Sequence, residues 1–434
     1  MILRDPVHGL VEFEGDAERV VTALLETREI QRLRRVRQLG LTSLVFPGAE
    51  HSRFSHALGS AHVMLRLQKR IRQRHSVLPV ELRLDDEAAR DSLAAALLHD
   101  LGHGPFSHLF EDVQPDARHH EEWTCDAIRD PFTEVHQALE GISSGMSERV
   151  ASMLEGNHRL AYLARSVSGM LDVDRADYLL RDSHMTGVRY GLYDLDWLLG
   201  ALSFGQLPSG EWVLAVEGRK GLPPLEGFFL GRHYMYQQVY HHKATRAAEA
   251  LIRALFATVG ERVREGRAPR GVPEAIRQAA LGDPVTLGEY LSLDDPILLS
   301  CFAQWERSDD VELAELARDL MTRRLPKTVP LDEEDESRWS EIHQRASEVV
   351  DAAGRRAERL VYLDVATDTP YAESDKGLWV LIRHRPIRRA GDASFLLGEL
   401  RNKSIRRPRL IFPASLRREV LTAIGELLSG EEEP

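Results

Sequence analysis

The stretch AAALLHDLGHGPFSH, residues 94–108, places two potential metal ligands at the end of an apolar run. The apolar residues before His99 and Asp100 predict the buried side of a helix, and Gly102 and the Gly104-Pro105 pair predict that it stops directly afterwards. A buried His-Asp pair is costly unless both side chains have partners. A metal ion bound by both side chains would give each of them a partner. The dipeptide alone, however, favours a core histidine hydrogen-bonded to its neighbour.

His99 and Asp100 supply only two ligands, so a metal site requires further ligands from other helices. Two segments are candidates: HSRFSHALG at residues 51–59 and LDVDRADYLLRD at residues 171–182. Each contains imidazoles or carboxylates within a stretch of helical periodicity.

Five ordered segments resemble the deoxynucleoside triphosphate triphosphohydrolases, the HD-domain group that contains the dGTPases and the SAM- and HD-domain dNTPase. These segments are DPVHG at Asp5, QRLRRVRQLG at Gln31, FPGAEHSRFSHALG at Phe46, HDLGHGPFSH at His99 and DVDRADYLLRD at Asp172. The resemblance is close over residues 1–260 and loose beyond them. It implies metal-dependent hydrolysis of dNTPs to a deoxynucleoside and tripolyphosphate. The alternatives are an HD-type nuclease or phosphodiesterase acting on nucleic acid or cyclic nucleotides, and a non-catalytic nucleotide sensor.

The resemblance also implies the metal ligands, which are His56, His99, Asp100 and Asp174. Two imidazoles and two carboxylates suit a divalent ion, which is manganese, iron, zinc or magnesium, and the nitrogen ligands make magnesium alone less natural. A divalent ion in such a site can activate water for attack at phosphorus. The catalytic residues implied around the α-phosphate are His103, His108 and His120 with Glu121. His120 and Glu121 are the expected pair for proton transfer, and His103 is the alternative.

Arg53 lies almost one helical turn before His56, so both side chains can point the same way, and a guanidinium suits phosphate oxygens. By resemblance, Arg175, Arg232 and Lys243 are further phosphate contacts. The sugar contacts implied are Gln38, Tyr178 and Asp182 at the 3′-hydroxyl, Tyr240 against the ring, and Leu39 at the 2′ position. The sequence departs from the family pattern at Arg175, where a lysine is common, and at Tyr236, where some members have a histidine.

The family resemblance implies an activator nucleotide at a subunit interface, and hence a homo-oligomer, either a dimer or a tetramer. Glu26, Gln31 and Arg34 fall at the corresponding positions, although ordinary charges on a helix surface explain them equally well.

The net charge of −12 argues against a stable nucleic-acid partner bound through bulk charge. The two cysteines, Cys125 and Cys301, form no zinc or disulfide pattern. The apolar start ends at Arg4, which indicates no signal peptide, and no apolar run approaches the length of a membrane span. These features predict a cytoplasmic protein without a membrane partner.

The elements that must position the site are predicted to be mostly helical. We expect an HD-domain helical core over residues 1–325, with a β-hairpin insertion at 204–218, and a small α/β appendage over residues 326–434. Within the core, apolar periodicity predicts helices at 16–25, 29–39, 54–74, 91–100, from 119, across 160–200 and at 225–256. In the appendage we expect strands near 359 and 378 and a closing helix at 415–428.

Overall fold

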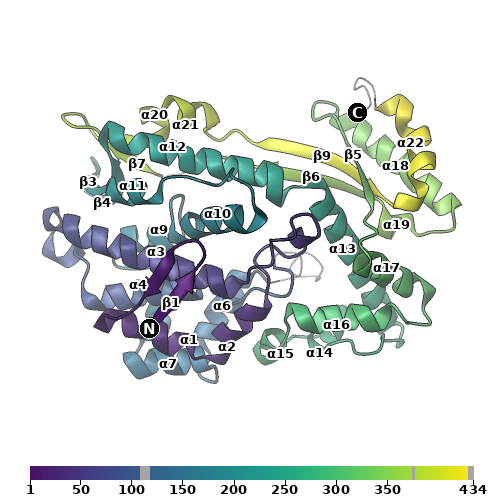
Figure 1. Cartoon of the computed structure of the whole chain (residues 1–434), viewed down its shortest axis with the longest axis horizontal. Coiled ribbons are helices and arrows are strands. Elements are labelled where there is room, and N and C mark those ends of the chain that lie inside the picture. Colours follow the sequence, from purple (N-terminus) through teal and green to yellow (C-terminus); the bar gives the residue numbers. More distant parts are fainter. Residues whose placement is uncertain (108–117, 374–376, 429–434) are drawn as a thin grey trace.

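Helix α3 (Arg53–Arg74) packs against both α4 (Asp86–Leu98) and α10 (Val173–Thr186), and this packing brings the predicted ligands together (Figure 1). The computed structural model describes residues 1–107, 118–373 and 377–428. Apolar residues recur every three or four positions along α3, so the helix buries a continuous stripe. The Asp85 side chain accepts a hydrogen bond from the Ala88 backbone N–H at 2.9 Å and so caps the start of α4.

Other helices enclose the first hydrophobic core around these three. They are α1 (Arg19–Leu25), α2 (Arg28–Arg32), α6 (His120–Arg129), α7 (Glu134–Ile142), α8 (Met146–Leu154), α9 (Ala161–Val167), α11 (Leu195–Gly200) and α12 (Gly218–Met235). A second core forms within α13 (Lys243–Arg264), α14 (Glu274–Leu281), α15 (Leu287–Leu291), α16 (Asp295–Trp305) and α17 (Val311–Met321).

Three small sheets complete the fold. The N-terminal hairpin pairs β1 (Ile2–Asp5) with β2 (Gly9–Glu12). The second sheet has the order β3 (Leu202–Gln206), β4 (Trp212–Glu217), β7 (Trp379–Leu381), β8 (Arg388–Arg389). The third sheet has the order β5 (Lys327–Pro330), β9 (Ile405–Phe412), β6 (Tyr362–Asp368), and all its pairings are antiparallel.

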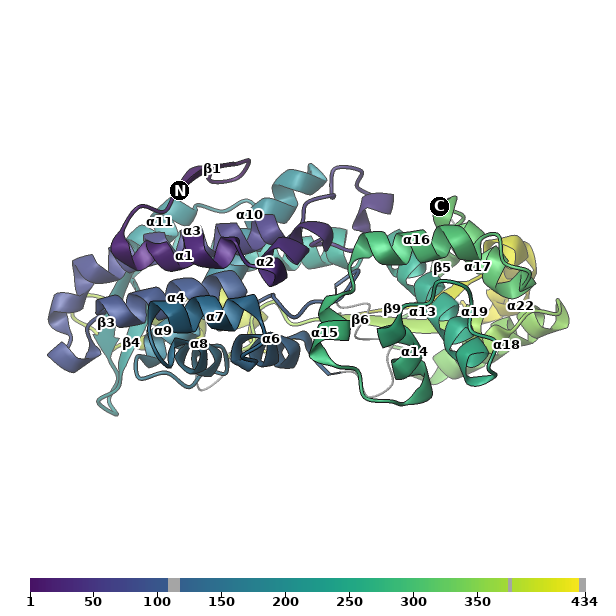
Figure 2. The ribbon, with the colours of Figure 1, turned by 90° about the horizontal axis from the view of Figure 1, so that it is seen from below.

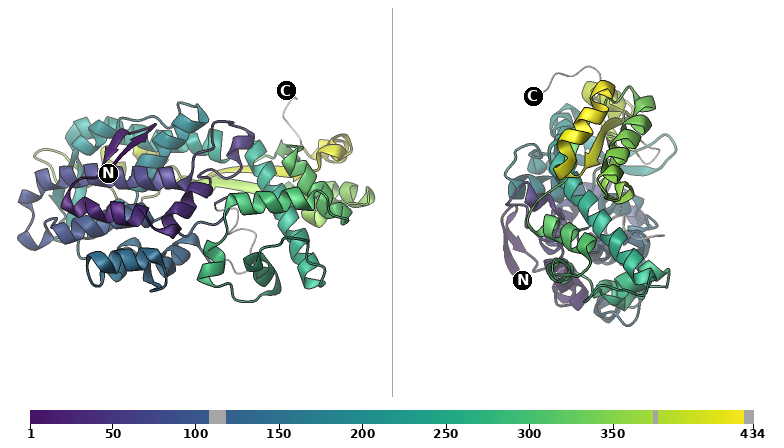
Figure 3. Two further views of the ribbon diagram at one scale, coloured as in Figure 1. Left: turned by 60° about the horizontal axis from the view of Figure 1, so that its bottom comes forward. Right: turned by 90° about the vertical axis from the view of Figure 1, so that its right-hand side faces the viewer.

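The C-terminal helices lie together at the end of the molecule opposite the N-terminal helices, and β6 and β9 run between the two ends (Figures 2 and 3). These helices are α18 (Glu336–Ala352), α19 (Ala357–Leu360) and α22 (Arg417–Ile424), and they share a third core with Leu410 and Phe412 of β9. The short helices α20 (Ala390–Ala393) and α21 (Phe395–Leu400) lie instead near α12 (Figure 1).

The mostly helical fold with small sheets is confirmed, as is the hairpin β3–β4. The C-terminal segment differs from a single appendage, because β7 pairs in parallel with β4 and thereby returns the chain to the first core. The expected helix 29–39 is wrong beyond residue 35. There the Val36 carbonyl accepts the Arg53 backbone N–H at 2.9 Å and Gln38 N–H donates to the His51 carbonyl at 3.0 Å, so tertiary pairing replaces the helix.

Two long helical predictions are also interrupted. The stretch 160–200 divides into α9, α10 and α11, with Gly187 ending α10 at a φ of +79°. The stretch 225–256 divides at a π-helical turn, Tyr236–Tyr240, after which the His242 side chain caps α13. Within the described ranges no helix combines the length and the apolar character needed to cross a membrane.

Candidate active site

The end of α4 delivers His99 and Asp100 to the site, as the apolar run predicted. The turn that follows is strained, with Phe106 and Ser107 at φ values of +55° and +60°. Asp295, at the start of α16, holds it by accepting the Phe106 backbone N–H at 2.9 Å. Helix α16, which belongs to the second core, therefore fixes the loop that follows the His-Asp pair.

Three predicted ligands from three helices converge on one point. His56 Nε2 lies 3.2 Å from His99 Nε2 and 3.0 Å from Asp174 Oδ1, and His99 Nε2 lies 3.4 Å from the same oxygen. The His56 side chain is fully buried, whereas the Asp174 side chain is 32% exposed. The cluster is thus closed at the back and reachable from solvent at Asp174.

The hydrogen bonds of the two imidazoles make this cluster suited to a cation. His56 Nδ1 lies 2.8 Å from a carboxylate oxygen of Asp177, and His99 Nδ1 lies 3.0 Å from the Ala96 carbonyl. Both acceptors lack a proton, so each Nδ1 must donate, and each ring in its neutral form has a lone pair at Nε2. Two lone pairs facing each other beside a carboxylate form a donor set that a divalent ion satisfies.

The carboxylates also favour positive charge at this point. Burial lowers the pKa of the His56 imidazole, but hydrogen bonds to Asp174 and Asp177 outweigh it and raise that pKa to about 10. Burial raises the pKa of Asp174, whereas its hydrogen bonds to His56 and His99 outweigh burial and hold the pKa below its usual range. A proton or a metal ion is therefore stabilised between these groups.

Asp100 lies between this cluster and a second group, which it forms with His103 and His120. Its Oδ2 lies 3.6 Å from His56 Nε2, and its Oδ1 lies 3.5 Å from His99 Nε2 and 3.2 Å from His103 Nε2. Asp100, His103 and His120 bring their ligand atoms within 4.8 Å of one another. Arg53 donates to Asp100 through Nη1, and this permanent cation disfavours a second metal ion there.

The His103 and His120 rings stack with their centroids 3.7 Å apart. Burial and Arg53 hold the pKa of His103 well below its usual range. Glu121 lies 3.9 Å from His120 but its side chain is 74% exposed, so the geometry favours His103 over Glu121 as the neighbour that orients His120. His108 lies outside the described residues.

The proposed sugar-binding residues lie around Asp182. Its Oδ1 is 2.7 Å from His51 Nε2, and its Oδ2 accepts the Tyr240 hydroxyl at 2.8 Å. The Tyr178 ring lies edge-on to both His56 and Tyr240, with centroids 6.4 and 6.2 Å apart. Both Asp182 oxygens are therefore already hydrogen-bonded within the protein.

Gln38 belongs to the extended segment that pairs with residues 51–53, through its own N–H to the His51 carbonyl, and Leu39 follows it. The Gln38 side-chain oxygen is buried and has no hydrogen-bond partner among the residues that the structure describes. Leu39 is partly buried against the first core. An unpaired buried acceptor is costly, so this amide is available for a bound hydroxyl.

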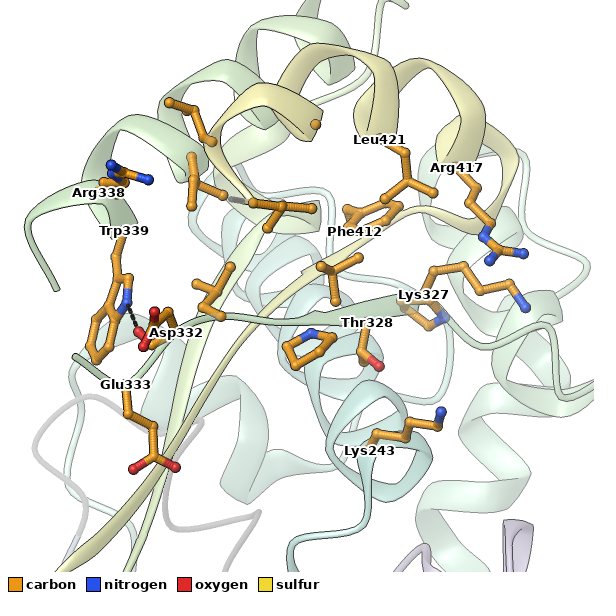
Figure 4. Close-up of a pocket in the computed structure, with 18 of the residues that line it drawn as sticks. Lys243, Lys327, Thr328, Asp332, Glu333, Arg338, Trp339, Phe412, Arg417 and Leu421 are labelled. Carbon is orange, nitrogen blue, oxygen red and sulfur yellow. Dashed lines mark hydrogen bonds between the residues drawn. The ribbon is translucent and has the colours of Figure 1, made fainter. Parts of the chain in front are cut away.

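The three other phosphate candidates have different surroundings. Arg175 donates to the Gly169 carbonyl, and Arg232 donates to Asp368 at 3.1 Å and stacks over Tyr236 at 4.4 Å. Lys243 is exposed at the start of α13 and lines a cavity of about 1480 Å³ with Lys327 and Thr328 of the C-terminal part (Figure 4). The residues lining that cavity include none of the predicted metal ligands.

Two of the three activator candidates, Gln31 and Arg34, contact each other. Gln31 donates to the Leu25 carbonyl at 2.6 Å, and Arg34 donates to Gln31 at 2.8 Å while its guanidinium lies 3.5 Å from the Phe54 ring centre. Glu26 is exposed nearby in the chain.

Sequence reasoning missed the buried groups behind the ligands. Asp177 accepts from His56, and His8 and Arg181 donate to Asp177. Asp5 in turn accepts a hydrogen bond from Arg181. His51 on Asp182 was also missed. The signal was present, because all five residues fall within the DPVHG, FPGAEHSRFSHALG and DVDRADYLLRD segments, but only the tertiary structure shows that they meet.

Comparison with known proteins identifies an HD domain in this chain. The HD domain family profile matches residues 53–182. The uncharacterized protein YwfO of Bacillus subtilis is 34% identical over 371 residues, covering 85% of this chain and 80% of YwfO. A phosphohydrolase structure from Bacteroides thetaiotaomicron superposes with a TM-score of 0.79 at 25% identity, covering 95% of this chain and 99% of that one.

A more distant similarity links the chain to named dNTPases. The deoxynucleoside triphosphate triphosphohydrolase SAMHD1 homolog of Dictyostelium discoideum is 31% identical over 265 residues. That match covers 59% of this chain and only 48% of the Dictyostelium protein. Taken together, the His-Asp cluster, the profile match and the similarity along most of YwfO show that the chain belongs to the HD-domain phosphohydrolase family.

Proposed function

We propose that the protein hydrolyses dNTPs to a deoxynucleoside and tripolyphosphate, with a divalent ion held by His56, His99, Asp100 and Asp174. The carrying observation is the pair of Nε2 atoms that face each other at 3.2 Å beside Asp174, with the buried Arg53 adjoining Asp100. The names of the SAMHD1 relatives support dNTPs as the substrate class.

The ion, when bound, supplies Lewis-acid activation of water and of a phosphoryl oxygen. The chain's own residues bind and orient the substrate. Arg53 is 3% exposed and its guanidinium offers donors in a planar fork that matches phosphate oxygens. Because Arg53 also contacts Asp100, a phosphate bound there lies next to the metal ligands.

His120 is the group that we assign to proton delivery at the leaving 5′-oxygen. Its side chain is 14% exposed, whereas His103 behind it is 1% exposed. His120 can thus reach a bound substrate while the stacked His103 ring fixes its plane. Proton delivery to the 5′-oxygen releases the three phosphates as one unit.

Selection for the deoxyribose rests on the residues around Asp182. Gln38 offers to the 3′-hydroxyl a buried oxygen that has no partner within the described part of the chain. The Tyr240 ring, which Asp182 fixes, packs against the sugar. Leu39 presents an apolar side chain to the 2′ position.

The competing activities can be separated by one substrate panel. The purified chain is incubated with dNTPs, NTPs, cyclic nucleotides and single-stranded oligonucleotides in the presence of manganese, iron, zinc or magnesium. We expect deoxynucleoside release from dNTPs and none with His99→Ala. Shortened oligonucleotides or opened cyclic nucleotides would support the nuclease or phosphodiesterase instead. Nucleotide binding without turnover under every metal would indicate a sensor.

A further inference from the structure

The turn of the N-terminal hairpin reaches the back of the metal ligand His56. His8 lies in this turn, between β1 and β2, and its side chain is 3% exposed. His8 Nε2 donates to Asp177 Oδ1 at 2.6 Å, and the other oxygen of Asp177 accepts His56 Nδ1–H at 2.8 Å. A single buried carboxylate therefore connects the hairpin to the cluster of His56, His99 and Asp174.

Arg181 completes the bonding of this carboxylate. It donates to both Asp177 oxygens at 2.8 and 2.9 Å and to Asp5 Oδ2 at 2.7 Å. The other oxygen of Asp5 accepts the backbone N–H groups of Val7 and His8, each at 2.9 Å, which shapes the turn that carries His8. Asp177 thus accepts four hydrogen bonds, so its orientation is fixed.

Gly59, one turn after His56 on α3, leaves the space that this arrangement requires. A Cβ atom at this position would overlap Asp177 Oδ1 and Arg181 Nη2. The backbone angles at Gly59 are those of an ordinary helix, which any residue can adopt. Glycine is needed there because only the absence of a side chain lets the carboxylate and the guanidinium approach so closely.

We propose that Asp177 is a positioning residue for the metal ligand His56, and that the N-terminal hairpin fixes the orientation of Asp177 through His8. Asp177 holds the His56 proton on Nδ1, which leaves the lone pair on Nε2 directed at the ion. A carboxylate behind a ligating imidazole fixes its tautomer and orientation, and losing such a partner weakens metal affinity by about 10–100-fold. The inference rests on the proposed metal site but not on the choice of nucleotide.

The hairpin's contribution is tested by two substitutions at one position. His8→Leu removes the donor to Asp177, whereas His8→Gln keeps an N–H that can donate to the same oxygen. Co²⁺ is titrated into the metal-free full-length chain, and binding is followed by visible absorption. We expect His8→Leu to weaken Co²⁺ binding measurably, by less than the loss of about 10–100-fold expected for the direct partner of His56, and His8→Gln to restore most of it. Equal weakening by both variants, or by neither, would overturn the role of His8.

Asp177→Asn tests the positioning itself, because its amide can donate to His56 Nδ1 and move the ring proton to Nε2. Nitrogen NMR of histidine-labelled protein loaded with diamagnetic Zn²⁺, which occupies Nε2 in place of a proton, should show His56 with its proton on Nδ1 in wild type and not in the variant. Asp91→Asn is the matched control, since Asp91 is 1% exposed and pairs with Arg149 at 2.8 Å without contacting a ligand.

We expect Asp177→Asn to weaken Co²⁺ binding and Asp91→Asn to leave it unchanged. Wild-type affinity in a folded Asp177→Asn chain, or equal loss in Asp91→Asn, would overturn the positioning role. If Asp177→Asn fails to fold, the comparison of His8→Leu with His8→Gln tests the positioning role instead. Failure of wild type itself to bind Co²⁺ would instead remove the proposed metal site.

Discussion

Arg53, the first residue of α3, donates from Nη1 to the Asp100 carboxylate directly after α4, and its Nε donates to Ser107 Oγ at 3.0 Å. The same Asp100 carboxylate neighbours His99 and His103. The proposed phosphate-binding residue and a proposed metal ligand are therefore hydrogen-bonded to each other. Under the proposed function, substrate binding and metal binding share this residue pair.

Arg53→Lys should separate these two functions. A lysine keeps the charge beside Asp100 but loses the planar fork, and a hydrogen bond to a charged group contributes about 1.5–3 kcal/mol. We expect kcat/KM for dNTP to fall by about 10–100-fold while metal content stays normal. Unchanged kcat/KM would show that Arg53 does not contact the substrate.

His99→Ala and His120→Ala should differ in metal content. His99 directs Nε2 into the cluster, so its removal should eliminate bound metal and activity together. His120 is assigned to proton transfer, so its removal should lower turnover by about 10²–10⁴-fold with metal retained. Elemental analysis of both purified variants checks this. A metal-free His120→Ala protein would make His120 a ligand.

Deoxyribonucleotides should be preferred over ribonucleotides. A 2′-hydroxyl against Leu39 would lack a partner, and an unpaired buried hydroxyl costs about 1–3 kcal/mol, which corresponds to about tenfold to a hundredfold in rate. Paired rates on dGTP and GTP, and on the other bases, measure the preference. Leu39→Ala should narrow it, and equal rates in the wild type would contradict the assigned sugar contacts.

Asp295 should make folding stability depend on pH. Burial raises its pKa to about 6 from the usual 3.8, so the folded chain holds this proton more tightly than the unfolded chain. The free energy of unfolding should therefore decrease as the pH rises between these values, by about 3 kcal/mol in total, and level off above. Asp295→Asn cannot titrate, so urea unfolding at several pH values should show that this component is gone. An identical pH slope in both proteins would contradict it.

The sequence predicted the ligand-bearing helices because each has a long, regular apolar period, as in α3, or a clear stop, as after His99. It could not predict the groups behind the ligands. His8 and Asp177 are 169 positions apart, and no local pattern indicates that they pair. The extended segment at Val36 and the return of β7 to β4 likewise depend on distant backbone hydrogen bonds that override local propensity.

The most direct test of the central claim is hydrolysis of a dNTP in heavy-oxygen water, followed by chromatography and mass spectrometry of the products. Attack at the α-phosphorus breaks its bond to the sugar 5′-oxygen, so the account predicts unlabelled deoxynucleoside and tripolyphosphate that carries one solvent oxygen. Formation of dNMP with pyrophosphate, of dNDP with phosphate, or of labelled deoxynucleoside would contradict it, because the substrate would then lie in a different register over His56, His99 and Asp174.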